Sequence, residues 1–506
     1  MPQPLFKRIL VANRSEIAVR VIRACRSLGI FAVAVYSEAD KQSKHCMIAD
    51  RAVLIGPPSP RESYLNIERI IQAAKQTGCD ALHPGYGFLA ENPLLPDACK
   101  SAGIVFIGPT AEAMKLLGNK VESRGKMADI GVPLIPGMKA AGSELAQFEG
   151  AAQSAGFPVI IKAAAGGGGK GMRIVREQFQ LKESLEAARR EALHAFGDDT
   201  VYLEKYLTEP RHIEFQVLAD QHGHCIHLFE RECSIQRRHQ KIIEETPSVA
   251  LTDELRVRMG ADAVKVAHAA GYTNAGTVEF LLDKSGKYYF LEMNTRIQVE
   301  HPITEMVTGV DLVVEQIKVA AGLPLGEYLK QLTQRGHAIE CRIYAEDGEN
   351  NFLPSTGKII HYSEPEGPGI RVDSGVALGS EISVHYDPIM AKLIVHAPDR
   401  RTAIVKMIDA LEQYKLLGVK TSRRFMIDVL SHPQFQSGNT FTNFIESHMK
   451  STNSTVNELQ RQLAAALASV VAAEPNKNAQ AVDSRSAARS PWQTIGGWQI
   501  GDSAVE

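Results

Sequence analysis

A regular alternation of strand and helix patterns over the first 118 residues constrains the fold most strongly. The pattern places strands at 9–12, 31–36 and 105–107, and helices at 15–28 and 67–75. Strands that alternate with helices pair in parallel through right-handed crossovers, and the helices cover the sheet. Residues 1–118 are therefore predicted to form a parallel α/β domain, in which the turn-rich segment 83–91 is a bend or a domain-facing loop.

The remaining sequence is long enough for two further domains and a tail, since 506 residues correspond to about three domains of roughly 150 residues. Residues 119–335 contain a helical start, a glycine-bearing hairpin and a strand-rich core, and residues 336–446 mix strands with a helix. Residues 447–506 indicate a helix, a polar linker and a short tail. The predicted fold class is α/β and α+β, with a parallel N-terminal domain, a central domain bearing a mobile glycine-rich hairpin, and a mixed C-terminal domain.

Composition argues against several classes of partner. The 56 Lys and Arg residues against 58 Asp and Glu leave a net charge of −2, so no global field attracts nucleic acid or a membrane surface. We find no apolar run of bilayer-spanning length and no signal-peptide pattern before the first strand. The seven cysteines include no C-x-x-C pair, which argues against a zinc knuckle or a disulfide framework. We therefore expect a cytoplasmic enzyme with neither a nucleic-acid nor a membrane partner.

A glycine-rich loop joins two strand patterns in the central block. Residues 157–162 and 172–175 are predicted strands, and the segment 163–171 between them contains four consecutive glycines. The spacing G-x-G-x-x-G occurs, but a strand follows it, whereas a dinucleotide site requires a helix. A Walker phosphate loop also fails, because Ala164 stands at its first glycine and Gly171 at its Ser or Thr. The remaining interpretation is a hairpin whose backbone amides close over phosphates.

A second hairpin is predicted over 276–294, with its turn at the sequence Asp-Lys-Ser-Gly. If Leu282 pairs with Lys287 across this turn, Glu279 stands directly opposite Phe290. The register decides which side chains share a face, because a slip of one residue moves a side chain to the other side of the sheet.

In that register three oxygen-bearing side chains project from one side of the hairpin: Glu279, Glu292 and Asn294. Residues diagonal across a ladder, and residues two apart along a strand, lie on the same face. Two carboxylates and an amide form a hard-oxygen cluster that suits Mg²⁺ or Mn²⁺. A solvated polar face would give the same pattern and is the alternative.

The sequence after this hairpin alternates charges of both signs. Arg296, Gln298 and Glu300 are predicted to continue the same face of the strand. A cation beside a carboxylate is suited to positioning an anion and moving its proton. Upstream, residues 230–241 hold several basic side chains, although such a stretch in isolation is more often a solvated surface.

Seven motifs follow one another along the chain: KRILVANR (7–14), HPGYGFL (83–89), GGGGKGM (166–172), EKYL (204–207), QRRHQK (236–241), EMNTRIQVEH (292–301) and ECR (340–342). Together they resemble the biotin carboxylases, the ATP-grasp component of acetyl-CoA, propionyl-CoA, methylcrotonyl-CoA and pyruvate carboxylases, from residue 8 to about 446. The resemblance implies an ATP-grasp fold for the central domain, between the N- and C-terminal domains of a biotin carboxylase.

The resemblance also implies roles for individual residues. Contacts to ATP are implied for Lys120, Lys162, Gly168, Gly169, Glu204, Lys205, Tyr206, Leu207, His212, Gln236 and His239. Mg²⁺ or Mn²⁺ would be held by Glu279, Glu292 and Asn294, as the hairpin suggests. Bicarbonate would lie among Lys241, Arg296, Gln298 and the backbone of Val299. Glu300 would remove its proton, and Arg342 would stabilise the enolate-like oxygen of biotin.

The implied reaction is the first half-reaction of an acyl-CoA carboxylase, which would serve fatty acid biosynthesis if the complex is an acetyl-CoA carboxylase. ATP and bicarbonate would form carboxyphosphate, and the products would be carboxybiotin, ADP and phosphate. Biotin would be a substrate on a separate carrier protein or domain. The other expected partners are a second copy of this chain and a carboxyltransferase subunit. The alternatives are another ATP-grasp carboxylate ligase and an inactive nucleotide-binding subunit.

Three details refine the resemblance. Ala165 and Lys170 stand where some members have a fifth glycine and an arginine, which is closer to the propionyl-CoA and methylcrotonyl-CoA type. The sequence AMKL around Lys115 is similar to a biotinylation motif, but a predicted helix contains it, so Lys115 is not expected to carry biotin. Trp492 and Trp498 resemble the start of the segment that follows the carboxylase in longer methylcrotonyl-CoA type proteins. We expect an incomplete or vestigial docking tail and biotin supplied by another chain.

Overall fold

The computed structural model describes residues 5–138, 141, 142, 144–164, 172–238, 240–348 and 350–449. These residues belong to the first of two units of the chain, Met1–Ser451. The predicted helix, linker and tail from 450 to 506, including Trp492 and Trp498, lie outside the described residues.

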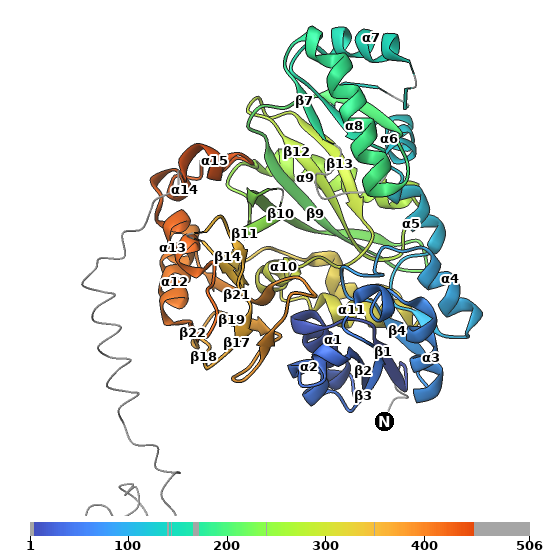
Figure 1. The fold of residues 1–506 in the computed structure, drawn as a ribbon, viewed down its shortest axis with the longest axis vertical. Coiled ribbons are helices and arrows are strands. Elements are labelled where there is room, and N and C mark those ends of the chain that lie inside the picture. The colour runs from blue at the N-terminus through green and yellow to red at the C-terminus, as the bar shows by residue number, and fades with distance from the viewer. Residues whose placement is uncertain are drawn as a thin grey trace, which may run out of the picture. The chain divides into compact units, whose positions relative to one another are not determined.

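A parallel five-stranded sheet forms the N-terminal domain, in the order β3-β2-β1-β4-β5 (Figure 1). Strands and helices alternate along the chain, which confirms the predicted parallel α/β class. The elements are β1 (Arg8–Val11), α1 (Ser15–Ser27), β2 (Phe31–Ser37), η1 (Glu38–Asp40), α2 (Lys44–Ile48), β3 (Arg51–Gly56), η2 (Pro60–Glu62), α3 (Ile67–Thr77), β4 (Ala81–His83), α4 (Leu94–Ser101), β5 (Val105–Phe106) and α5 (Ala111–Gly118).

Helix α3 shows how local sequence sets the bounds of these elements. The Asn66 side chain accepts a hydrogen bond from the backbone N–H of Arg69 at 3.0 Å and caps the first turn. Ile70 and Ala74, four residues apart, are buried on one face of the helix. Gly78 ends the helix at a φ of 65°, a conformation that glycine adopts without a Cβ clash.

A three-stranded antiparallel sheet of order β7-β6-β8 and its helices follow. The two strands predicted on either side of the glycine-rich loop pair with each other, and the glycines between them lie outside the described residues. The elements are α6 (Lys120–Asp129), α7 (Leu145–Ala155), β6 (Val159–Ala163), β7 (Arg173–Val175), η3 (Gln178–Gln180), α8 (Leu181–Phe196) and β8 (Val201–Lys205).

An eight-stranded sheet of order β13-β12-β9-β10-β11-β14-β21-β19 forms the rest of the frame. It contains strands from both sides of residue 335, where we predicted a domain boundary, and that boundary stays a prediction. Its first part comprises β9 (Arg211–Ala219), β10 (Cys225–Arg237), β11 (Gln240–Thr246), α9 (Asp253–Ala269), β12 (Asn274–Leu282), β13 (Tyr288–Asn294), α10 (His301–Thr308), α11 (Leu312–Ala320) and η4 (Glu327–Gln331).

The C-terminal part adds the remaining strands of this sheet and several short two-stranded ladders. Its elements are β14 (His337–Tyr344), β15 (Glu346–Asp347), β16 (Leu353–Pro354), β17 (Gly357–Lys358), β18 (His361–Ser363), β19 (Ile370–Ser374), β20 (Glu381–Ile382), β21 (Ile389–Ala397), α12 (Arg400–Gln413), β22 (Lys415–Leu417), α13 (Arg423–Ser431), α14 (Pro433–Gln436) and α15 (Phe444–His448). Among the described residues, no helix combines the length and the apolar character needed to cross a membrane.

One hydrophobic cluster joins the N-terminal sheet to the helices beside the larger sheet. Ile9 and Ile17 of the N-terminal domain pack in the same cluster as Leu312 and Ile317 of α11. All four side chains are at most 2% exposed. This shared core holds the N-terminal domain against the sheet that carries the site.

Candidate functional site

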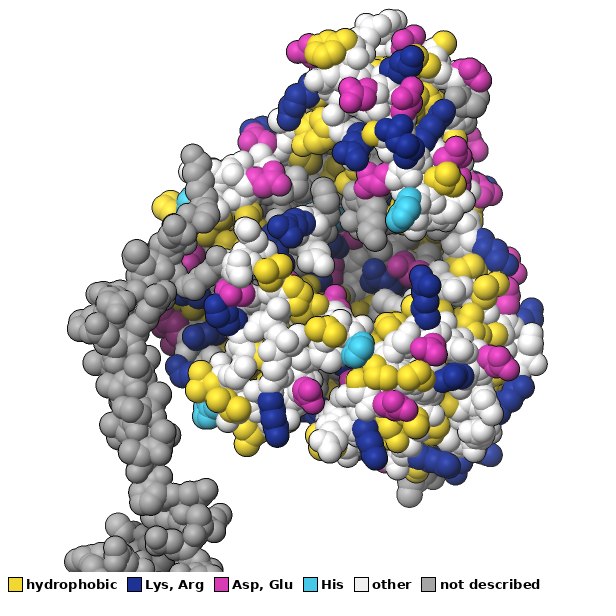
Figure 2. Space-filling model, viewed as in Figure 1, with side chains coloured by type: hydrophobic (Ala, Val, Ile, Leu, Met, Phe, Trp, Pro, Cys, Tyr) yellow, Lys and Arg dark blue, Asp and Glu magenta, His cyan; other side chains and the backbone are white. Residues whose placement is uncertain are grey.

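The predicted site residues converge on one cavity of about 680 Å³, lined by strands of the three-stranded and the eight-stranded sheets. On the face drawn in Figure 2, basic and acidic side chains lie at the bottom of a hollow. The predicted residues that line the cavity are Lys120, Lys162, Lys205, Tyr206, Leu207, His212, Gln236, Lys241, Glu279, Glu292, Asn294, Arg296, Gln298, Val299, Glu300 and Arg342. Glu204 is buried behind Lys162, and Gly168, Gly169 and His239 lie outside the described residues. A smaller cavity of about 370 Å³ between β3 and α3 is lined by none of the predicted residues that the structure describes.

Lys241 on β11 is the centre of the charge network in this cavity. Its Nζ lies 2.5 Å from Glu214 Oε2, 2.8 Å from Glu279 Oε1 and 2.7 Å from Glu300 Oε1. Burial by itself would lower the pKa of Lys241, but the three carboxylates outweigh burial and raise that pKa well above its usual value. Lys241 is therefore a charged ammonium at neutral pH, held by three carboxylates.

Glu300 lies between two cations at the N-terminal end of α10. Its Oε1 accepts a hydrogen bond from Lys241, and its Oε2 accepts one from Arg342 Nη2 at 3.0 Å. Arg342 is itself held on β14 by Glu244, which accepts from its Nε at 2.6 Å. Burial by itself would raise the pKa of Glu300, yet Lys241 and Arg342 hold this pKa well below its usual range. Glu300 is therefore ionised at neutral pH.

The predicted register of the β12–β13 hairpin is wrong at its turn. Leu282 pairs with Tyr288 and not with Lys287. The reason is a longer turn, because the backbone N–H of Asp283 donates to the carbonyl of Lys287 at 2.8 Å and closes the loop one residue later. The Asp283 side chain also accepts from the Lys287 N–H at 3.0 Å.

A bulge in β13 changes the register again before the acidic residues. Phe280 lies opposite Phe290, but Glu279 lies opposite Glu292, so β13 contains one extra residue. Our prediction that Glu279 faces Phe290 is therefore wrong. Asn294 Nδ2 donates to Glu279 Oε1 at 2.9 Å, and all three predicted metal ligands lie on one cavity wall.

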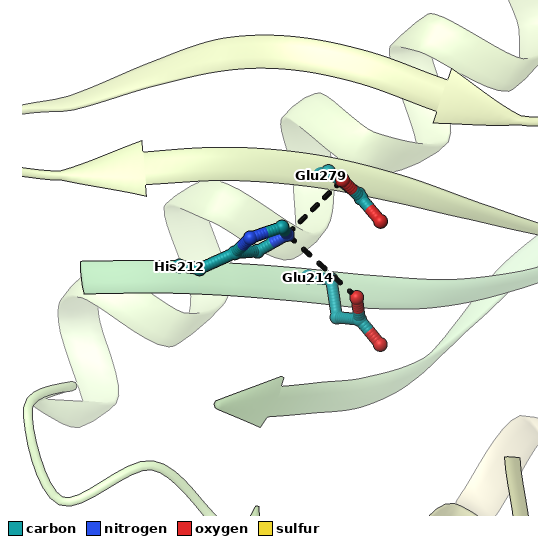
Figure 3. A group of neighbouring side chains, drawn as sticks. All are labelled: His212, Glu214 and Glu279. Atoms are coloured by element: carbon teal, nitrogen blue, oxygen red, sulfur yellow. Dashed lines mark ion pairs between the residues drawn. The ribbon is translucent and has the colours of Figure 1, made fainter. Parts of the chain in front are cut away.

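His212 and Glu214, two residues apart on β9, face Glu279 on the adjacent strand β12 (Figure 3). His212 Nε2 lies 3.0 Å from Glu279 Oε2 and 3.9 Å from Glu214 Oε2. One ligand atom from each of the three residues lies within 4.8 Å of the others. The sequence analysis missed Glu214, which the alternation of β9 from His212 could have identified.

Residues 295–300 do not continue the strand as we predicted. β13 ends at Asn294, and α10 begins at His301 with Pro302 in its first turn. Proline favours the start of a helix because its missing N–H would have no partner there. The side chains predicted for this segment still line the cavity: Arg296, Gln298 and Glu300.

Arg296 has a partner that the sequence analysis missed. Glu91 Oε2 lies 3.0 Å from Arg296 Nε, and Glu91 Oε1 accepts from the backbone N–H of Thr295 at 3.2 Å. The turn-rich loop 83–91 therefore contacts the cavity wall from the N-terminal domain. No local pattern could have identified Glu91, because its partners are about two hundred residues away in the sequence.

Two further lysines that line the cavity pair with glutamates. Lys162 on β6 places its Nζ 2.5 Å from Glu204 Oε2, and Lys120 at the start of α6 places its Nζ 3.4 Å from Glu292 Oε2. Burial would raise the pKa of Glu204, but Lys162 and Arg124 lower it. The cavity thus holds two lysine ammonium groups in addition to the cluster around Lys241.

Family models match three consecutive parts of the chain. The model described as "Biotin carboxylase, N-terminal domain" matches residues 5–114, and "Biotin carboxylase C-terminal domain" matches residues 340–447. Between them, "Carbamoyl-phosphate synthase L chain, ATP binding domain" matches residues 119–328.

Curated relatives are similar over most of the chain. A pyruvate carboxylase component of Methanothermobacter thermautotrophicus is 53% identical over 90% of this chain and 93% of its own length. Biotin carboxylase 1 of Bacillus subtilis is 50% identical over 88% of this chain and 99% of its own. The alpha chain of the mitochondrial methylcrotonoyl-CoA carboxylase of Dictyostelium discoideum is 48% identical over 98% of this chain, which spans 71% of that protein.

Solved structures have the same fold. Biotin carboxylase of Campylobacter jejuni, in its β-γ-ATP complex, has a TM-score of 0.85 and 46% identity over 88% of this chain and 99% of its own. The biotin carboxylase domain dimer of Hydrogenobacter thermophilus 2-oxoglutarate carboxylase, with MgADP, ADP and bicarbonate, has a TM-score of 0.84 and 48% identity over 88% of this chain and 98% of its own. This chain belongs to the biotin carboxylase family.

Proposed function

We propose that this chain catalyses the ATP-dependent carboxylation of biotin with bicarbonate, as a ligase that forms carboxybiotin, ADP and phosphate. One observation carries the proposal: the half-buried Lys241 contacts Glu279 of the acidic hairpin and Glu300 at the same time. The cavity therefore joins a cluster suited to Mg²⁺ and phosphates to a cluster suited to bicarbonate.

The metal end of the cavity fits Mg²⁺ or Mn²⁺. Glu279 and Glu292 lie opposite each other across the ladder, and Asn294 adds an amide to the same wall. Hard oxygen donors of this kind are what these ions take. We assign these three residues to the ion, which would neutralise charge on the phosphates of ATP.

Two lysines that line the cavity support binding of ATP. Lys120 and Lys162 would pair with phosphate oxygens, and Glu204 would orient Lys162 through their ion pair. Seven other predicted residues complete the proposed nucleotide site: Gly168, Gly169, Lys205, Tyr206, Leu207, Gln236 and His239. His212 would help to position Glu279, which lies 3.0 Å from its ring.

Bicarbonate would lie among Lys241, Arg296, Gln298 and the backbone of Val299. Lys241 and Arg342 lower the pKa of Glu300, so that its carboxylate binds a proton weakly. An anion that pairs with Lys241 would take up part of this cationic charge and raise the pKa of Glu300. Glu300 could then accept the bicarbonate proton while a bicarbonate oxygen attacks the γ-phosphorus and ADP leaves.

Arg342 would act in the second step of the reaction. Carboxyphosphate breaks down to CO₂ and phosphate, and this phosphate takes the proton of the ureido nitrogen of biotin. The nitrogen then attacks CO₂, and the guanidinium of Arg342 would stabilise the negative charge on the ureido oxygen. Two ion pairs hold this guanidinium in place, to Glu244 on β11 and to Glu300 before α10.

The proposal includes partners and a location. Biotin would arrive on a carrier protein or domain and leave towards a carboxyltransferase, and the relatives named as parts of carboxylases support this division of labour. Lys115 lies within α5, which disfavours biotin attachment to its AMKL sequence. A dimeric relative supports a homodimer. We place the enzyme in the cytoplasm, where an acetyl-CoA carboxylase would serve fatty acid biosynthesis.

The decisive assay is bicarbonate-dependent hydrolysis of ATP, measured with and without free biotin. Stimulation by biotin is expected for a biotin carboxylase. Folded protein that hydrolyses ATP in the presence of Mg²⁺ and bicarbonate without any response to biotin would favour another carboxylate ligase. Protein that binds ATP but never hydrolyses it would indicate an inactive nucleotide-binding subunit.

A further inference from the structure

Arg231 on β10 has the largest side chain of the fully buried residues in the described part of the chain. It does not line the cavity, and no predicted role includes it. A buried guanidinium is costly unless each of its N–H groups finds an acceptor. The acceptors of Arg231 therefore indicate what the residue holds in place.

All five N–H groups of Arg231 have an acceptor, which is the full capacity of a guanidinium. Nε donates to Glu214 Oε1 at 2.6 Å. Nη1 donates to Gln216 Oε1 at 2.9 Å and to Thr304 Oγ1 at 3.0 Å. Nη2 donates to Thr277 Oγ1 at 3.1 Å and to Gln298 Oε1 at 3.4 Å. A lysine has only three donors, all on one nitrogen, and could not make these five hydrogen bonds in one plane.

The first connection to the cavity runs through Glu214. One oxygen of this carboxylate accepts from Arg231, and the other lies 2.5 Å from Lys241 Nζ. Arg231 and Lys241 therefore share the Glu214 carboxylate, with one cation on each oxygen. Without it, Glu214 would pull Lys241 away from Glu279 and Glu300.

The second connection sets the orientation of the Gln298 amide. Its Oε1 lies 3.4 Å from both Arg231 Nη2 and Lys241 Nζ, and its Nε2 donates to Glu279 Oε1 at 2.9 Å. Two cations on the oxygen side hold the amide in this orientation, because a flipped amide would place N–H groups against both of them.

The third connection holds helix α10. Thr304 lies four residues after Glu300, about one helical turn, and its hydroxyl accepts from Arg231 Nη1. Glu300 is the residue immediately before the first turn of α10. The bond from Arg231 therefore ties the helix that presents Glu300 to the sheet that presents Lys241.

We propose that Arg231 is a positioning residue of the bicarbonate site, which sets Lys241, Gln298 and Glu300 relative to one another without touching bicarbonate. This inference rests on the proposed function. One buried side chain would thus hold Lys241 of β11 in place relative to Gln298 and Glu300, which precede α10.

The test compares Arg231→Lys with a matched control, Arg256→Lys. Arg256 also donates to a buried glutamate of β10, Glu230, at 2.9 and 3.0 Å, and neither Glu230 nor its other partner Asp253 lines the cavity. The steady-state rate of biotin-dependent ATP hydrolysis is measured against bicarbonate and, separately, against ATP. Arg231→Lys is expected to raise the KM for bicarbonate about tenfold or more, with the KM for ATP within about twofold. Arg256→Lys is expected to change neither KM beyond about twofold.

A second pair of variants tests the same inference if Arg231→Lys does not fold. Thr304→Val removes one acceptor of Arg231, whereas Thr304→Ser retains the hydroxyl. Thr304→Val should raise the KM for bicarbonate about two- to tenfold, whereas Thr304→Ser should keep this KM near the wild-type value. An unchanged KM for bicarbonate, or a parallel rise in both KM values, would overturn the inference. Wild-type protein without biotin-dependent activity would instead reject the proposed function.

Discussion

Glu279 on β12 and Glu292 on β13 lie directly opposite each other because β13 contains one extra residue beyond Phe290. In a regular strand, Glu292 would share the face of Phe290, which is buried in the core at 1% exposure. The bulge turns Glu292 towards the cavity, where both carboxylates can reach one ion.

Glu292→Ala is expected to weaken binding of Mg·ATP about tenfold or more, because the ion loses one of its proposed oxygen ligands. Titration of ATP hydrolysis with Mg²⁺ at a fixed ATP concentration measures the effect. Glu254→Ala, on the exposed side of α9, is the control and should titrate like wild type. A Glu292→Ala titration that matches wild type would contradict the proposed metal site.

Glu300→Gln is expected to abolish turnover, with a loss of about a hundredfold or more, while ATP binding stays nearly intact. The amide keeps the size of the side chain but cannot accept the bicarbonate proton. Carboxylation of free biotin measures turnover, and calorimetric titration with ATP measures binding. Turnover equal to that of wild type would remove Glu300 as the base.

Glu91→Gln is expected to raise the KM for bicarbonate about two- to fivefold, because it removes the carboxylate charge beside Arg296. The effect is small because the Glu91 side chain is 44% exposed and solvent screens the pair. Asp97→Asn breaks an exposed pair with Lys115 in the same domain and should leave this KM unchanged. Equal KM values for Glu91→Gln and wild type would show that Arg296 does not depend on the loop.

Asp40→Asn should destabilise the N-terminal domain in a pH-dependent way. Asp40 accepts from Arg14 Nε at 2.6 Å and from Tyr64 Oη at 2.7 Å. Burial by itself would raise the pKa of Asp40, but Arg14 reverses this effect and lowers the pKa from 3.8 to about 2. Because the pKa is lower in the folded state, the ionised carboxylate stabilises folding above pH 3.8, and this stabilisation is lost as the pH falls towards 2.

The difference in pKa corresponds to about 2–3 kcal/mol at neutral pH. Melting temperatures of wild type and Asp40→Asn should therefore differ by several degrees at pH 7, and the difference should shrink below pH 4. Lys330→Gln, which breaks an exposed ion pair with Glu327, provides a control whose melting temperature stays near that of wild type at both pH values. A difference that is the same at pH 7 and pH 3 would contradict the role of the Asp40 carboxylate.

Local features of the chain were sufficient for much of the fold. The alternation from 9 to 107 predicted the parallel sheet, because each strand and helix there carries its own hydrophobic period. The register of the β12–β13 hairpin was not predictable in this way. It depends on where the turn at Asp283 closes and on a bulge next to Phe290, whose side chain is buried in the core.

By itself, the sequence determined which residue types are available to the site and in which order they occur, since the motifs are short and contiguous. Only the tertiary structure decided their partners. Lys241 meets Glu214 through pairing across β9, β10 and β11, Arg296 meets Glu91 across two domains, and Arg231 meets Thr304 where α10 packs on the sheet. A charged side chain can be buried only where its partners converge, and that convergence is a property of the packed chain, not of any segment.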